Sequence, residues 1–288
     1  MIPATTKLYL TPILDFLQNL VEWYSKEYLR QWITYSRSQQ TSAVSKALFT
    51  PEKLLVLRSR LTASTLTWPN LIPTVLMEMF FFSFPDAFGL HINSFLMMDA
   101  FAECGYLTLG VDYFLGDPVT KHSLTPLSDP NFDFESWKNK HLKASEEAAA
   151  RWVKAVKTQY GTSEDVKFAS VGYCWGARFV CQQLSADGIC KVGAIAHPSF
   201  LKESDVFYVQ EPIFFSVPST DKLFEPAQRS RTIEILTENN KQFNMQVFAN
   251  IGHGFASRAR LTDPYEKWAK EASFKSFVDW FDFWMNKQ

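Results

Sequence analysis

One cysteine of the sequence stands in a setting that favours nucleophilic chemistry. Gly172-Tyr173-Cys174-Trp175-Gly176 follows a short apolar run and precedes a helical pattern. This is the spacing of the nucleophile elbow G-x-S-x-G, with cysteine in place of serine. Such an elbow lifts the nucleophile above a sheet, and the positive end of the following helix stabilises a developing anion. We therefore expect Cys174 to act as a nucleophile; the alternative is an inert buried cysteine.

Two further residues follow in the order that this chemistry requires. Asp221 comes after the apolar run 213–217, and His253 comes after the run 243–248. Nucleophile, acid and histidine appear in this order in α/β-hydrolase triads. A histidine can activate first the thiol and then a water molecule, and an acid can orient that histidine. The alternatives are a surface loop histidine at position 253 and a helix N-cap at position 221.

These residues need a sheet whose strands end at one edge. From residue 79 onward, apolar runs alternate with helical patterns, which predicts strands near 79–84, 106–111, 166–171, 192–196, 212–217 and 243–248, and helices near 94–104, 134–160, 177–184, 226–238 and 265–285. This alternation predicts an α/β fold with a mostly parallel central sheet and helices on both faces. Ligands bind beyond the carboxyl ends of such strands. The residues placed there are Asp86, Asp112, Cys174, His197, Asp221 and His253.

Residues 1–78 differ in character from the rest of the chain. Apolar residues recur near helical spacing over 1–48, and three prolines interrupt the stretch that follows. We therefore divide the chain into an atypical, mostly helical segment of unclear function (1–78) and an α/β domain (79–288). Polar residues such as Asp15 and Glu22 interrupt the first apolar stretch, which is neither a signal peptide nor a membrane span.

The composition excludes several classes of function. The 288 residues carry a formal net charge of −1, which argues against a chain-wide affinity for nucleic acid or an anionic membrane. Four cysteines without a C-x-x-C pair predict neither a zinc ribbon nor a disulfide-stapled secreted domain. We expect a cytoplasmic protein without a metal site.

Several stretches together resemble one known family, the dienelactone hydrolases, most closely in their eukaryotic, fungal-like branch. The matching stretches are Pro85-Asp86-Ala87-Phe88-Gly89, Cys104-Gly105-Tyr106, Val111 to Pro118, Gly172 to Ala177, Ala196 to Ser199 and His253 to Ala256. The resemblance covers about 79–288. It implies an α/β-hydrolase fold that cleaves an ester or a lactone without a cofactor.

The resemblance also implies a role for individual residues. Cys174 would be the nucleophile, His253 the base, and Asp221 the acid that orients the base. The backbone N–H groups of Ala87 and Trp175 would form the oxyanion hole.

Three more residues are candidates for the substrate pocket. Asp86 stands where the family usually has glutamate, a carboxylate associated with the resting thiol. Arg258 lies close to the position of an arginine that binds a substrate carboxylate; a surface charge is the alternative. His197 follows a strand and could line the pocket, or its side chain could be satisfied by the backbone.

The leading hypothesis is a hydrolase that cleaves a small ester or lactone through a Cys-His-Asp triad and an acyl-enzyme, acting as a monomer or homodimer. The alternative is a catalytically weak or inactive member of the fold that serves as a binding or interaction protein. The family's early strands would have to lie within 1–78, which look helical instead. That segment could also mediate oligomerisation or partner binding.

Overall fold

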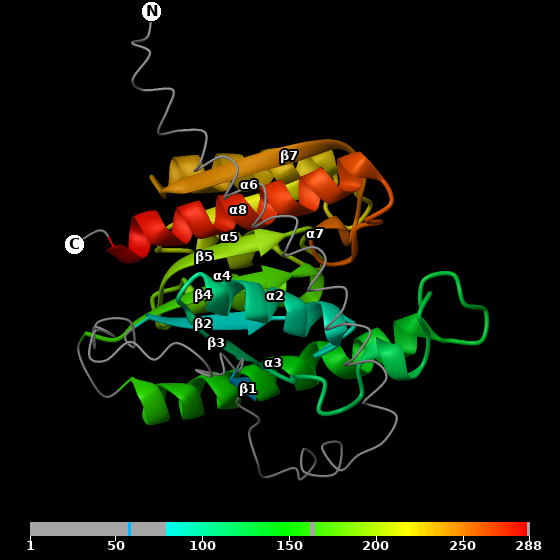
Figure 1. The fold of residues 1–288 in the computed structure, drawn as a ribbon, viewed down its shortest axis with the longest axis horizontal. Helices are drawn as coiled ribbons and strands as arrows, with labels where there is room; N and C mark the ends of the chain where they lie inside the picture. The colour runs from blue at the N-terminus through cyan, green and yellow to red at the C-terminus, as the bar shows by residue number, and fades with distance from the viewer. Residues whose placement is uncertain (1–56, 59–78, 162–164, 287–288) are drawn as a thin grey trace, which may run out of the picture. The chain divides into compact units, whose positions relative to one another are not determined.

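The computed structural model describes residues 57–58, 79–161 and 165–286. The described strands form one seven-stranded sheet in the order β1-β3-β2-β4-β5-β6-β7 (Figure 1). β2 to β7 run parallel, and β1 pairs antiparallel with β3. The strands are β1 Leu57–Arg58, β2 Met79–Phe84, β3 Leu107–Gly110, β4 Lys167–Tyr173, β5 Cys190–Ala196, β6 Ile213–Thr220 and β7 Phe243–Gly252.

Helices cover both faces of this sheet, as the alternation of the sequence predicts. The core on one face draws on α3 (Phe134–Tyr160), α4 (Ala177–Gln183), α5 (Glu203–Phe207) and α6 (Pro226–Glu238). The core on the other face draws on α2 (Ile92–Glu103), α7 (Phe255–Arg258) and α8 (Pro264–Asn286). In Figure 1, α2 and α8 lie in front of the sheet. Two 3₁₀ turns complete the elements, η3 Val119–Lys121 and η4 Cys174–Gly176.

Strand β2 shows why the sequence is rich in phenylalanine. Phe82 and Phe84 point into the core on the α3 side, where Phe82 packs edge-on against Trp152. Phe81 points to the other face and packs against Phe281 of α8. Both faces of a parallel strand are buried, so the strand reads as a continuous apolar run rather than an alternating one. Each such ring contributes about 1.5–3 kcal/mol by leaving water.

Most of the predicted elements are present, with small shifts at their ends. α6 begins and ends at the predicted residues, and Gly105, with φ of 95°, follows the end of α2. β7 extends to Gly252, four residues beyond the predicted end, and the short helix α5 was not predicted. β1 lies within the segment 1–78, which we expect to be mostly helical. The remainder of that segment lies outside the described residues.

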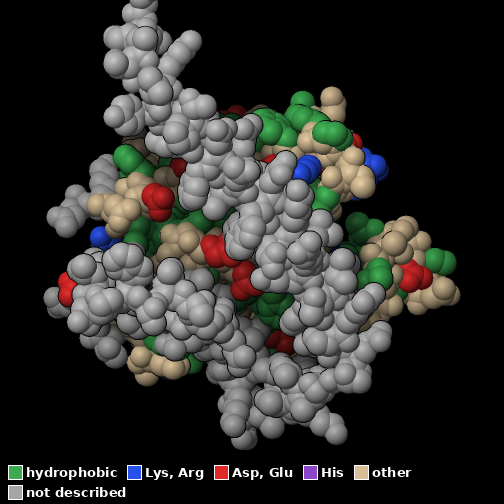
Figure 2. Space-filling view, in the orientation of Figure 1, with side chains coloured by type: hydrophobic (Ala, Val, Ile, Leu, Met, Phe, Trp, Pro, Cys, Tyr) green, Lys and Arg blue, Asp and Glu red, His purple; other side chains and the backbone are tan. Residues whose placement is uncertain are grey.

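The described surface carries charges of both signs. On the face shown in Figure 2, acidic and basic side chains both occur, among hydrophobic ones. This agrees with the near balance of 29 basic and 30 acidic residues in the sequence. Among the described residues, no helix combines the length and the apolar character needed to span a membrane.

The turn between β4 and α4 depends on two glycines that leave no room for a side chain. A Cβ atom on Gly172 would lie 2.6 Å from the carbonyl oxygen of Gly176. A Cβ atom on Gly176 would lie 2.2 Å from the carbonyl oxygen of Phe84 in the neighbouring strand β2. Backbone atoms cannot move aside as a flexible side chain can. The spacing of the G-x-C-x-G motif is therefore explained by packing at the turn.

This packing makes a prediction for stability. Gly176→Ala should lower the free energy of unfolding by about 3 kcal/mol, because the added methyl group overlaps the backbone of β2. Gly252→Ala is the control, since a Cβ atom there meets no atom within 4 Å. Urea unfolding followed by tryptophan fluorescence measures both variants. Equal losses in the two variants would contradict the account of the turn.

Candidate active site

Cys174 occupies the turn directly after β4, at the carboxyl edge of the sheet. Its backbone has φ of 51°, a left-handed conformation that costs a non-glycine residue about 1–2 kcal/mol. The residue is buried, and η4 and then α4 begin at this point. Non-glycine residues are held in such strained conformations mostly at functional sites. The geometry is that of the expected nucleophile elbow.

Asp221 and His253 meet at the same edge of the sheet. Asp221 follows β6 and His253 follows β7, and these two strands are neighbours in the sheet. Nδ1 of His253 lies 2.8 Å from Oδ2 of Asp221. An ionised carboxylate can only accept a hydrogen bond, so Nδ1 carries the hydrogen and donates it. With Nδ1 paired to Asp221, Nε2 is the ring nitrogen left to interact with the Cys174 thiol and to transfer a proton.

The Cys174 thiol and the His253 imidazole shift each other's pKa. Burial alone would raise the pKa of the thiol, but the charge of His253, with hydrogen bonds from Ser199 and the Ala87 backbone, lowers it overall. Burial likewise opposes the charged imidazole, but Cys174 and Asp221 together raise the pKa of His253 to about 10. Both shifts favour a thiolate paired with an imidazolium at neutral pH.

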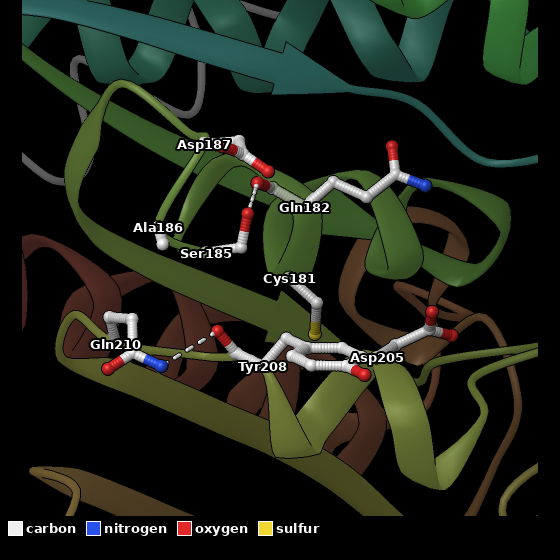
Figure 3. A pocket seen from close by; sticks show the side chains of 8 residues that line it. All are labelled: Cys181, Gln182, Ser185, Ala186, Asp187, Asp205, Tyr208 and Gln210. Carbon is white, nitrogen blue, oxygen red and sulfur yellow. Dashed lines mark hydrogen bonds between the residues drawn. The ribbon is translucent and has the colours of Figure 1, made fainter.

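The other three cysteines have the opposite character. Burial raises the pKa of Cys104 and Cys181 and raises that of Cys190 to about 12. Cys181 lies on the wall of a cavity of about 300 Å³ with Asp205 and Tyr208 (Figure 3). The cavity is lined by residues that precede β5 and β6, so it lies toward the edge of the sheet opposite the triad. Cys174 is thus the one cysteine whose surroundings activate it.

The backbone amides of Ala87 and Trp175, which we expect to form the oxyanion hole, belong to residues near Cys174. The backbone N–H of Ala87, just after β2, donates a hydrogen bond toward the sulfur of Cys174. Trp175 is the second residue of η4, and the first amide groups of a helical turn have no acceptor within it. Two backbone donors near one nucleophile can bind the oxygen of a tetrahedral intermediate.

Asp86 and Arg258 pair with each other. Their side chains form an ion pair, and the Arg258 guanidinium lies 4.1 Å from the ring centroid of Phe88. Asp86 also accepts hydrogen bonds from Ser257 Oγ at 3.0 Å and from the Phe88 backbone at 2.9 Å. Among its described partners the thiol of Cys174 does not occur. The structure therefore links the loop after β2 to helix α7 through residues that we expected to serve thiol and substrate separately.

His197, which follows β5, packs against the ring of His253. It is fully buried, and its ring centroid lies 5.0 Å from that of His253, at an interplanar angle of 67°. Burial and the charge of His253 hold the pKa of His197 well below its usual range. Its imidazole is therefore neutral. Neither ring nitrogen has a hydrogen-bond partner within the described residues, so backbone satisfaction of the side chain is not observed.

Ser199 is a site residue that the sequence analysis missed. Its Oγ lies 3.3 Å from the sulfur of Cys174, and its backbone N–H donates to the Cys174 carbonyl at 3.1 Å. The sequence offers two signals, its position three residues after the end of β5 and its place in the family-like stretch Ala196 to Ser199. In the part of the chain that the structure describes, no group of three or more His, Cys, Asp or Glu side chains could hold a metal ion.

Comparison with known proteins places the chain in a family. A family model described as the dienelactone hydrolase family matches residues 73–284. The chain is 83% identical over 205 residues to Dienlactone hydrolase 2 of the fungus Gibberella moniliformis, which covers 71% of this chain and 78% of that protein. It is 65% identical, with the same coverage, to Dienlactone hydrolase 1 of the same fungus. These relatives agree with the expected fungal-like branch.

Solved structures show the same fold. A putative dienelactone hydrolase from Klebsiella pneumoniae superimposes with a TM-score of 0.59 at 17% identity, covering 71% of this chain and 86% of that one. At this identity the likeness concerns the fold alone, and it confirms the predicted α/β-hydrolase architecture. The chain belongs to the dienelactone hydrolase family and is a carboxylic ester or lactone hydrolase.

Proposed function

We propose that this hydrolase cleaves its substrate through a Cys174-His253-Asp221 triad and an acyl-enzyme. One observation carries the proposal: a buried cysteine on a strained turn has its pKa lowered by a histidine, and that histidine donates to a buried aspartate. A thiolate is the nucleophilic form of cysteine, and a neighbouring imidazolium stabilises it.

In the first half of the reaction, the Cys174 sulfur attacks the carbonyl carbon of the substrate and a C–S bond forms. The electron pair of the C=O bond moves to oxygen, where the backbone N–H groups of Ala87 and Trp175 bind it. When the pair returns, the C–O bond to the leaving alcohol breaks. The proton on Nε2 of His253 moves to that alkoxide. A thioester on Cys174 and a neutral His253 remain.

In the second half, water resolves the thioester. Neutral His253 takes a proton from water, and the hydroxide adds to the thioester carbon. The C–S bond breaks, its electron pair stays on sulfur, and the carboxylic acid is released. The thiolate and the imidazolium are restored. Asp221 holds Nδ1 of His253 through both halves, which keeps Nε2 toward the reacting atoms.

The substrate is a small ester or lactone, as the names of the fungal relatives suggest. Arg258 is the candidate for binding a carboxylate on that substrate, and its side chain is 24% exposed. Because Asp86 already neutralises Arg258, a substrate carboxylate has to compete with Asp86 for it. We propose that His197 positions the ring of His253 by packing against it and does not line the substrate pocket.

Removing the sulfur tests the proposed nucleophile. Cys174→Ala should reduce the rate of hydrolysis of p-nitrophenyl acetate at least about 10³-fold, because no other group at the site forms the acyl-enzyme. Cys104→Ala is the control, since Cys104 is exposed and lies at the end of α2. Substantial hydrolysis by Cys174→Ala with an intact fold would refute the nucleophile. Loss in both variants would point to a structural effect.

The ion pair predicts a bell-shaped dependence of hydrolysis on pH. As pH falls through the lowered pKa of Cys174, the thiolate takes up a proton and kcat/KM declines. As pH rises through about 10, His253 loses its proton and the leaving alkoxide has no donor. Initial rates with a phenyl ester, corrected for the uncatalysed reaction, measure both limbs.

Asp221→Asn should move the alkaline limb to lower pH, because the carboxylate helps to raise the pKa of His253. An alkaline limb that stays in place in this variant would contradict the assigned role of Asp221.

A catalytically inactive binding protein is the alternative, and a thiol probe separates the two. If iodoacetamide modifies Cys174 no faster at neutral pH than Cys104, the activated thiolate is absent and the binding role gains support.

A further inference from the structure

The loop of residues 197–200, between β5 and α5, contacts two members of the triad. Ser199 lies against the sulfur of Cys174, and the ring of His197 lies against that of His253. The mechanism outlined above assigns this loop no chemical step. Residues 196–199 are one of the stretches that resemble the family, but that resemblance gives Ser199 no role, so its contact with the reacting sulfur requires its own explanation.

The loop is strained and fixed at both ends. His197 and Phe200 have φ of 36° and 56°, in the left-handed region that non-glycine residues rarely adopt. The His197 backbone N–H donates to the carbonyl of Ser216 at 3.0 Å, and the Phe200 ring packs edge-on against Trp175 at 5.2 Å. Strain of this kind persists only where the surroundings over-determine the conformation. The surroundings thus hold Ser199 in place.

The direction of the contact between Ser199 and Cys174 follows from the state of the sulfur. Oγ and Sγ lie 3.3 Å apart, and either atom could donate while the thiol is protonated; a thiolate has no hydrogen, so the Ser199 hydroxyl is the donor in that form. Both residues are buried, with Ser199 completely inaccessible, so water does not compete for the hydrogen bond. Donation to the charged form of a group favours that form.

We propose that Ser199 is a further catalytic residue, whose hydroxyl donates a hydrogen bond to the Cys174 sulfur whenever that sulfur carries a negative charge. This rests on the proposed function, since it needs Cys174 as the nucleophile. In the proposed mechanism the sulfur is charged before it attacks the substrate, and again when the C–S bond of the hydrated thioester breaks and its electron pair returns to sulfur. In the thioester the charge is absent, and the Ser199 hydrogen bond weakens. Ser199 therefore favours departure of the thiolate in the second half of the reaction.

His197 serves in this arrangement as a positioning residue. Its neutral ring lies edge-on to His253 and leaves His253 little freedom to rotate away from Asp221. A neutral neighbour also leaves the charge of the imidazolium directed to the thiolate. One short loop thus contacts both members of the ion pair, since Ser199 contacts Cys174 and His197 contacts His253.

The test compares Ser199→Ala with Ser273→Ala. Ser273 is also buried, and its Oγ lies 2.6 Å from Ser216 Oγ, away from the triad, so its loss removes a hydroxyl of the same kind. The rate at which iodoacetamide alkylates Cys174 near neutral pH, followed on the peptide by mass spectrometry, reports the thiolate without requiring turnover. We expect this rate, and kcat for ester hydrolysis, to fall about tenfold in Ser199→Ala with KM little changed. Ser273→Ala should alkylate at the wild-type rate.

Two results would overturn the role of Ser199. One is alkylation in Ser199→Ala at or above the wild-type rate, which would make the hydroxyl an acceptor or a bystander. The other is slow alkylation in Ser199→Thr, which keeps the hydroxyl and is expected to retain most of the wild-type rate. Urea unfolding of each variant separates these outcomes from loss of the fold. Failure of the triad itself shows differently, as hydrolysis that persists in Cys174→Ala.

Discussion

The proposed site depends on one electrostatic arrangement, a buried cysteine and a buried histidine whose neighbouring side chains favour each other's charged form. Burial by itself would keep the thiol of Cys174 protonated and His253 neutral, and each group offsets that penalty largely through the other. Asp221 supports the positive member from the far side. The backbone of Ala87 and the hydroxyl of Ser199 support the negative member. Because the two charges stabilise each other, a displacement of either side chain would weaken the stabilisation of both.

The fold supplies the rigidity that this arrangement needs. The participating residues follow β2, β4, β5, β6 and β7, neighbouring strands whose carboxyl ends meet at one edge. Gly172 and Gly176 let the backbone of the elbow approach within contact distance of itself and of β2. The ion pair between Asp86 and Arg258 connects the loop after β2 to helix α7, which begins two residues after His253. The strained conformation of Cys174 is retained because the sheet and these loops fix it on every side.

Much of the fold and of the candidate site could be predicted from the sequence. The periodicity of apolar residues and the order of motifs can be read along the chain without knowing which loops meet. Apolar runs and helical patterns located the parallel sheet, and the G-x-C-x-G spacing located Cys174 within it. Asp221 and His253 followed from their order along the chain. Contacts between loops could not be predicted in this way. Nothing in the residues near Ser199 indicates that a left-handed backbone at His197 and Phe200 turns its hydroxyl toward the sulfur. The pairing of Asp86 with Arg258, 172 residues apart, is likewise visible only in three dimensions.

The central claim is that the acyl group of the substrate is carried by the sulfur of Cys174, and trapping that intermediate tests it most directly. The wild-type enzyme, mixed with a slowly released aryl ester and quenched in acid, would be digested and its peptides weighed by mass spectrometry. The account predicts one acyl group on the peptide that contains Cys174, lost when the sample is treated with hydroxylamine. An acyl group on the peptide that contains Ser199, or turnover with no acylated peptide at all, would contradict it.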